Sequence, residues 1–185
     1  MYQWYLLAWI GVIALFTKSV GYTRVVNSFG QKEKRYGWMT VLAVAIPLIY
    51  VAGIRKNITW GDTSAYKIMF NNLPDSLGGL SGFFTEESKD KGFTVLSVVL
   101  KSIFGNNQII YFTLIAAVCI LCVAWVYKEY SCNFFISMFL FVASADYLQW
   151  AFNGMRQFIA IAVSFACIKL ILDKKDVPVI IIILL

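Results

Sequence analysis

The segment Phe152-Asn153-Gly154-Met155-Arg156-Gln157 combines residue types that bind anions at the start of a helix. Asn153 is a common N-cap residue and precedes an apolar stretch, so Arg156 and Gln157 are expected in the first turn of the following helix. Free backbone N–H groups, the positive end of the helix dipole and a guanidinium would then converge, an arrangement suited to phosphate. The alternative is that Arg156 lies at a membrane interface and extends to lipid headgroups.

A second polar segment begins with Gly53-Ile54-Arg55 and continues with Gly61-Asp62-Thr63-Ser64-Ala65-Tyr66. Asp62 is placed to cap a short helix through Phe70, because its carboxylate can accept hydrogen bonds from the free N–H groups of the first turn. Arg55 either marks a membrane interface or belongs to a binding site. Both residues therefore have a structural and a functional interpretation.

Asp146 and Gln149 are polar residues inside an otherwise apolar stretch. An acid about two turns inside the end of a membrane span is costly unless it is paired or faces water. Gln149 lies three residues after Asp146 and is expected on the same helical face. These two residues predict a polar cavity.

The elements that carry these segments are transmembrane helices. Of the 185 residues, 60% are hydrophobic and 14% are charged, whereas soluble domains carry roughly 25% charged residues. A helix needs about 20 apolar residues to cross the hydrocarbon core. The sequence predicts an all-α, polytopic helix bundle as a single domain, with spans at residues 2–16, 36–54, 109–127, 134–152, 154–172 and, incompletely, 177–185. Because the sixth stretch is still apolar at Leu185, we expect the sequence to be the N-terminal part of a larger protein.

Basic residues in the short loops orient these predicted spans. The segment after the first span has five basic residues, Lys18, Arg24, Lys32, Lys34 and Arg35, against one acid, Glu33. By the positive-inside rule this loop is cytoplasmic and the N-terminus is external. Alternation then places residues 128–133 and 173–176 inside, and residues 55–108 and 153–157 outside. The net charge of +6 is thereby explained by topology, without a nucleic-acid partner.

The long external connection, residues 55–108, contains an apolar piece at 93–104 that is too short to span. Thr94, Ser97 and Lys101 share one stripe, which predicts an amphipathic helix in the interface or lining a cavity, with Lys101 toward water or headgroups. The preceding Asp90-Lys91-Gly92-Phe93 is interpreted structurally, as a turn and an interfacial anchor.

The sequence predicts no metal site and no cofactor. It contains no histidine, and its outer-face acids lack the spacing of metal ligands. Cys119 and Cys122 form a C-x-x-C pair, but they lie inside an apolar stretch without further cysteine or histidine nearby.

These polar segments resemble the EpsG family of bacterial exopolysaccharide polymerases, which is related in function to Wzy O-antigen polymerases. The matching residues, in order, are Gly53-Ile54-Arg55, Asp62-Thr63, Tyr66, Gly92-Phe93, the segment from Phe152 to Gln157, and Ala160. No single one of these motifs is specific for the family. The resemblance rests on their order and spacing, with each motif at a predicted helix end on the outer face of the membrane.

The resemblance implies a GT-C-like membrane glycosyltransferase in the bacterial plasma membrane. It would join oligosaccharide repeat units on undecaprenyl pyrophosphate at the outer face, in exopolysaccharide or capsule biosynthesis. Arg156 and Arg55 would stabilise the pyrophosphate leaving group, and Asp62 would activate the acceptor hydroxyl or bind a sugar. Asn153, Gln157, Tyr66, Asp146 and Gln149 would bind substrate. Similar proteins are about twice as long and carry histidine in the remaining half.

The implied partners are membrane lipid, the lipid-linked oligosaccharide, a chain-length regulator and a flippase. Two other functions stay open. The chain could be a flippase or transporter for lipid-linked oligosaccharide, although no internal repeat is visible and the charges cluster on one face. It could also be a noncatalytic membrane subunit of the export machinery.

Overall fold

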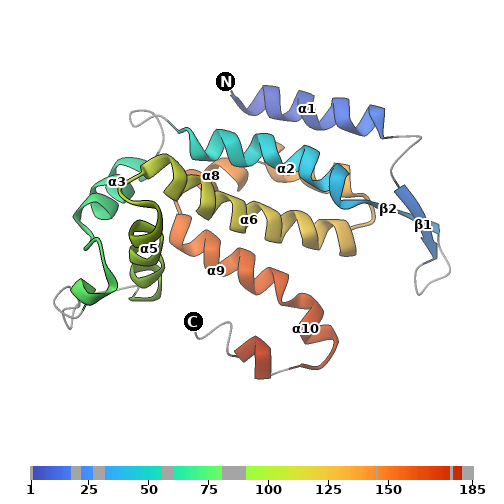
Figure 1. Ribbon diagram of the computed structural model, residues 1–185. Coiled ribbons are helices and arrows are strands. Elements are labelled where there is room, and N and C mark those ends of the chain that lie inside the picture. Colours follow the sequence, from blue (N-terminus) through green and yellow to red (C-terminus); the bar gives the residue numbers. More distant parts are fainter. Residues whose placement is uncertain are drawn as a thin grey trace.

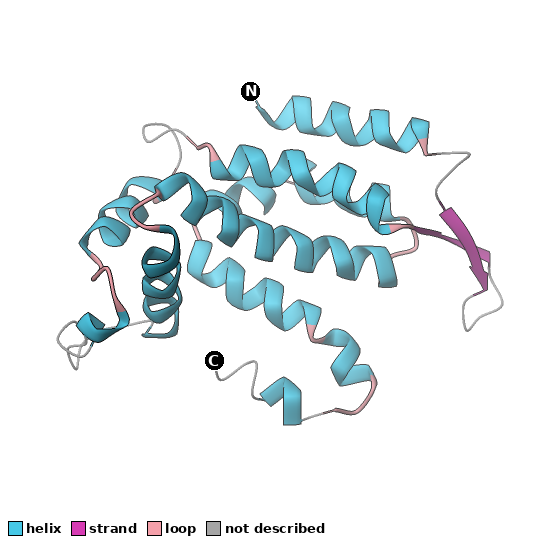
Figure 2. Cartoon of the chain, in the orientation of Figure 1, coloured by secondary structure: helices cyan, strands magenta, loops and turns pink. Residues whose placement is uncertain are grey.

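The computed structural model describes residues 2–17, 22–26, 32–55, 61–80, 91–144, 146–175 and 177–180. Most of these residues are helical, and the long helices lie side by side (Figures 1 and 2). The helices are α1 Tyr2–Phe16, α2 Trp38–Gly53, α3 Thr63–Asn72, α5 Lys91–Phe104, α6 Gln108–Tyr130, α7 Phe134–Ala143, α8 Asp146–Phe152, α9 Met155–Ala166 and α10 Ile168–Leu172, with a 3-10 turn η1 at Leu77–Gly79.

Among the residues that the structure describes, two helical segments are long and apolar enough to cross a membrane, namely α6 and the continuous segment Met155–Leu172 formed by α9 and α10. The bent pair of α7 and α8 adds a third candidate, and α1 and α2 are shorter apolar helices. The prediction of an all-α membrane protein is confirmed. The six predicted spans and their sidedness stay a prediction.

Helix α6 is the centre of the bundle, with α2 on one side and α9 on the other. Its residues Cys119, Ile120 and Ala124 are fully buried. A close approach of α2 to α6 is possible because Gly53 has no side chain, since a Cβ there would meet Thr113 Oγ1 at 2.1 Å. Helix α1 packs against α7 and α2. This packing fixes the end of α2, and with it the position of Arg55.

The predicted span at residues 134–152 contains two helices, α7 and α8, which meet at 66°, and the bent pair stays a candidate span. Asp146 is exposed and begins α8, where its carboxylate accepts a 2.7 Å hydrogen bond from Ser144 Oγ. An acid at a helix N-terminus with a hydroxyl donor is favourable, so Asp146 does not require the deep polar cavity predicted for it.

The loop between α1 and α2 contains a β-hairpin that was not predicted. Strands β1 Tyr22–Val26 and β2 Lys32–Tyr36 pair antiparallel, with Tyr22 opposite Tyr36. The hairpin is tied to the end of α6 by an ion pair of 2.7 Å between Arg35 Nη1 and Glu129 Oε2. The basic loop is therefore partly ordered against the bundle.

Helix α5 contains the predicted amphipathic segment, but its polar stripe faces the protein. Lys101 is only 4% exposed, and its Nζ donates to the carbonyls of Asn71 at 3.0 Å and Leu73 at 2.6 Å. Asp75 pairs with the same ammonium at 3.0 Å. The expectation that Lys101 points to water or headgroups is wrong, because the last turn of α3 and the chain that follows it supply the oxygen atoms that satisfy its charge.

Candidate functional site

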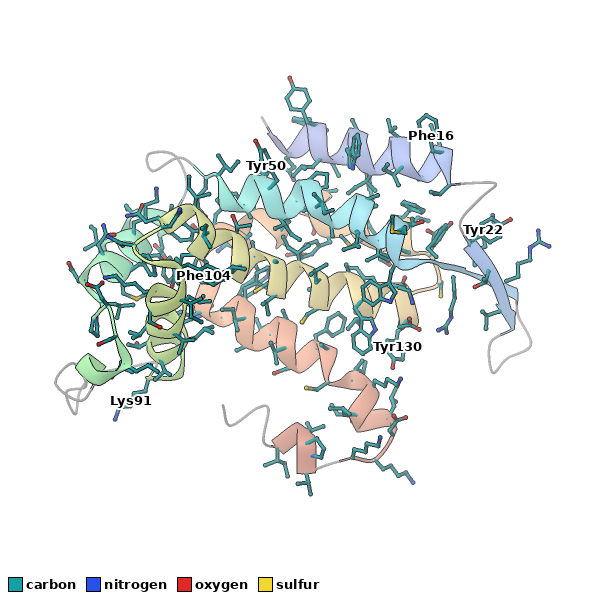
Figure 3. All side chains as sticks on the ribbon, in the orientation of Figure 1. Phe16, Tyr22, Tyr50, Lys91, Phe104 and Tyr130 are labelled. Atoms are coloured by element: carbon teal, nitrogen blue, oxygen red, sulfur yellow. The ribbon has the colours of Figure 1, made fainter. Side chains whose placement is uncertain are left out.

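The ends of α2 and α8 and the starts of α3, α6 and α9 come together at one end of the bundle, through contacts such as those of Arg55 with Ala151 and of Gly61 with Asn153. In Figure 1 this is the end of the bundle at which α3 lies. In Figure 3 the side chains of α3, α5 and the first turns of α6 are crowded together here, near the labelled Phe104. Residues from three of the predicted polar segments, together with Lys67, form what we call the α2–α9 cluster: Arg55, Gly61, Thr63, Tyr66, Lys67, Gln149, Asn153 and Arg156.

Arg55 is the buried cation of the α2–α9 cluster, at 8% exposure. Its Nε donates to the Ala52 carbonyl and its Nη1 to the Ala151 carbonyl, each at 2.8 Å. Both carbonyls belong to the last turns of helices, where backbone oxygens lack helical partners and the helix dipole is negative. Arg55 therefore joins the ends of α2 and α8.

Two aromatic rings cover the guanidinium of Arg55. Its Cζ lies 4.1 Å from the centroid of the Phe112 ring and 5.1 Å from that of Phe152. The faces of these rings attract the cation while they exclude water from it. Burial lowers the pKa of Arg55 to about 10, and this effect is partly offset by Tyr147, Tyr111 and Tyr66. The side chain is still charged at neutral pH.

The third guanidinium nitrogen of Arg55, Nη2, is buried and has no hydrogen-bond partner among the described residues. Two other buried side-chain atoms of the described chain share this property, Thr63 Oγ1 and Asn153 Oδ1. All three belong to the α2–α9 cluster. An unpartnered buried polar group is costly and rare in native proteins, so a concentration at one place indicates a site that a ligand completes.

Asn153 connects the cluster to the start of α3. Gly61 has a φ of +53°, and a Cβ on it would lie 1.2 Å from Asn153 Oδ1, so only glycine allows this contact. The Asn153 amide also donates to Gln149 Oε1 at 3.1 Å. Gly61 and Gln149 thus hold Asn153 from two sides.

The prediction that Asn153 caps the fifth span is wrong. Helix α9 begins at Met155, its N-cap is Gly154, and no side chain makes a cap hydrogen bond there. The Asn153 side chain points back to α8 instead, because Gln149 offers it a partner one turn earlier. Arg156 and Gln157 still lie in the first turn of α9, and both are exposed.

Arg156 contacts the cluster through the ring of Tyr66, which packs against Phe93. Its Cζ lies 5.8 Å from the Tyr66 ring of α3, and Tyr66 in turn meets Phe93 of α5 edge to face at 6.1 Å. Tyr66 and Phe93 are two of the residues on which the sequence resemblance rested. Phe93 of α5 therefore supports the Tyr66 ring, and its predicted place in the membrane interface stays a prediction.

Lys67 is a third cation of the cluster, and it was not among the predicted site residues. Its Nζ lies 6.0 Å from the same Phe112 ring that covers Arg55. Burial lowers the pKa of Lys67, and the neighbouring charge of Arg55 lowers it further. In the sequence, its position directly after Tyr66 could have indicated that Lys67 belongs to the site. Thr63 was also not predicted as a site residue, because it was interpreted as part of the helix cap with Asp62.

Asp62 occupies the N-cap position of α3, as predicted, but its side chain makes no cap hydrogen bond. The carboxylate is exposed beside the cluster. Asp146 is not brought to the cluster, because it lies at the opposite end of α8 from Phe152. Of the predicted site residues, the structure thus gathers Arg55, Tyr66, Gln149, Asn153 and Arg156, with Asp62 and Gln157 at the margin.

Within the described part of the chain, no group of three or more His, Cys, Asp or Glu side chains is placed to hold a metal ion. Cys119 and Cys122 are unpaired thiols within α6, away from the cluster. The charged side chains that form the cluster are the cations Arg55, Lys67 and Arg156, and together they suit a multiply charged anion such as a phosphate ester.

The EpsG family model matches residues 38–185, a range that includes every residue of the α2–α9 cluster. No curated protein and no solved structure matches the chain.

Proposed function

Because this chain belongs to the EpsG family, with a polymerase-like role in exopolysaccharide biosynthesis, we propose that it is a membrane glycosyltransferase acting on lipid-linked sugars. Its substrate is an oligosaccharide repeat unit on undecaprenyl pyrophosphate, and its product is a longer glycan on the same carrier. The reaction takes place at the outer face of the plasma membrane.

The observation that carries this proposal is the open donor of Arg55. Two nitrogens of the guanidinium are fixed by helix-end carbonyls, and Nη2 is left for a ligand in surroundings from which Phe112 and Phe152 exclude water. A donor that is already oriented stabilises developing negative charge without reorganisation. In glycosyl transfer from a pyrophosphate, that charge develops on the leaving phosphate.

The proposed step breaks one bond and forms one. The acceptor hydroxyl oxygen attacks the anomeric carbon, and the bond from that carbon to the pyrophosphate oxygen breaks. The electron pair of the broken bond passes to the pyrophosphate, where Arg55, Arg156 and Lys67 stabilise it. Asp62 accepts the proton of the acceptor hydroxyl. No metal takes part, since the three cations replace its charge.

The remaining polar residues of the cluster bind the sugar. Asn153 and Gln149 present amide groups that match sugar hydroxyls, and Tyr66 offers an aromatic face beside them. Gln157 is exposed in the first turn of α9 and extends this surface outward. Arg156 is also exposed and meets the pyrophosphate first, whereas Nη2 of Arg55 is reached only when covering side chains move aside.

The proposal is tested with the full-length protein reconstituted in liposomes with lipid-linked repeat units. A polymerase produces a ladder of glycans that differ by one repeat unit, with release of one undecaprenyl pyrophosphate for each bond formed. Movement of unextended repeat units from one leaflet to the other would instead indicate a transporter. If neither elongation nor movement of the repeat units is observed, the chain is a noncatalytic subunit.

A further inference from the structure

A pocket of about 350 Å³ lies at the other end of the bundle, far from the α2–α9 cluster. It is lined by residues of the hairpin, the end of α6 and α10, namely Arg35, Trp125, Glu129, Tyr130 and Lys169. Tyr130 is labelled at this end in Figure 3. The proposed glycosyl transfer uses none of these residues.

The lining of this pocket combines cations with aromatic rings. Glu129 is held by Arg35 and by the neighbouring Lys128, so its charge is neutralised within the protein. Lys169 has no ion-pair partner among the described residues. Trp125 and Tyr130 form an edge-to-face pair at 6.4 Å. The pocket lining thus holds two cations, one neutralised carboxylate, a tryptophan and a phenol.

The depth of the pocket along the bundle fits the headgroup layer of a membrane. Both segments that are long and apolar enough to span, α6 and Met155–Leu172, end at this pocket. Helix α6 has 23 residues, which at about 1.5 Å per residue exceeds the roughly 30 Å of the hydrocarbon core. Its last turn therefore emerges among headgroups, where tryptophan and tyrosine are enriched.

We propose that this pocket binds the headgroup of an anionic phospholipid such as phosphatidylglycerol. Lys169 donates to the phosphate, Arg35 adds a second cation, and the Tyr130 hydroxyl donates to the polar part of the headgroup. Trp125 packs against the upper acyl chain. The exposed cations Arg24, Lys34, Lys174 and Lys175 of the adjoining hairpin and turn draw anionic lipids to this surface.

The test is native mass spectrometry of the purified full-length protein with short-chain phosphatidylglycerol. Lys169→Gln removes the pocket cation that has no ion pair, and Lys91→Gln removes an exposed cation at the other end of the bundle as the matched control. Loss of one charge-assisted hydrogen bond predicts about a tenfold or greater weakening for Lys169→Gln. Lys91→Gln is expected to bind within twofold of the unchanged protein.

Two comparisons identify the ligand. Phosphatidylcholine with the same acyl chains is expected to bind at least tenfold more weakly than phosphatidylglycerol, and glycerol phosphate not measurably. Equal binding by both lipids, equal effects of the two substitutions, or binding of glycerol phosphate as tight as that of the lipid would each overturn the proposal. Thermal unfolding of each variant verifies that Lys169→Gln is folded. The outcome is independent of polymerase activity.

Discussion

Arg55→Lys tests whether the open donor at the end of α2 takes part in the reaction. Arginine uses Nε and Nη1 for the carbonyls of Ala52 and Ala151 and keeps Nη2 for a ligand. Lysine retains the charge but has a single nitrogen, which cannot reach all three positions. The change therefore removes hydrogen bonds without removing the cation.

The expected loss of activity follows from the number of donors removed. Losing one preorganised donor to a developing oxyanion costs about 10²–10³-fold in rate. Losing one charged hydrogen bond to a helix-end carbonyl costs roughly 1.5–3 kcal/mol of stability. We expect the rate of glycan elongation by Arg55→Lys to fall by at least 10²-fold, measured as initial rate per amount of folded protein in liposomes.

Lys101→Gln provides the matched control for this experiment. Lys101 is also a buried cation that donates to two backbone carbonyls, those of Asn71 and Leu73, but it has its own counterion in Asp75. This variant is expected to unfold at a lower temperature and to keep more than a third of the elongation rate. An elongation rate of Arg55→Lys within threefold of the unchanged protein would refute a catalytic role for the open donor.

Three further predictions follow from the same structure. Because lysine cannot form the bidentate hydrogen bond by which Arg156 is proposed to bind the pyrophosphate, Arg156→Lys should lose most of the polymer yield at equal expression. An undiminished yield would show that Arg156 is an interfacial residue and not a substrate-binding one. Gly61→Ala should reduce elongation at least tenfold with the cations intact, because its Cβ would collide with Asn153 and positive φ disfavours alanine, and normal activity would show that this contact is dispensable. In cells whose exposed native cysteine has been replaced, an impermeant thiol reagent should label Lys91→Cys but not Lys34→Cys, and the reverse pattern would invert the topology.

Hydropathy was sufficient to locate the long helices because lipid requires internally bonded apolar segments. The predicted stretch 2–16 coincides with α1, and 154–172 with α9 and α10. Local breaks carry no such signal. The bend before Asp146 depends on packing of α8 against α7 and α9, and the hairpin at Lys32–Tyr36 depends on cross-strand contacts such as that of Tyr22 with Tyr36.

The candidate site was predictable in position and less so in detail. Arg156 was selected because it was expected in the first turn of a helix, where backbone N–H groups and a guanidinium suit an anion, and Arg55 because it follows the end of an apolar stretch. The partners of Asn153 and Lys101 were not predictable, because each is satisfied by a residue or carbonyl that only the fold brings near. Lys67 was missed for the same reason, since its proximity to Arg55 depends on Phe112 of another helix.

The central claim is that the α2–α9 cluster holds the pyrophosphate of a lipid-linked sugar. The most direct measurement is a cryo-electron microscopy structure of the full-length protein with a non-hydrolysable analogue of the lipid-linked repeat unit. We predict a phosphate oxygen about 2.8 Å from Nη2 of Arg55, with Arg156 and Lys67 turned toward the same pyrophosphate. A pyrophosphate bound elsewhere, with Nη2 of Arg55 hydrogen-bonded to the protein itself, would contradict it.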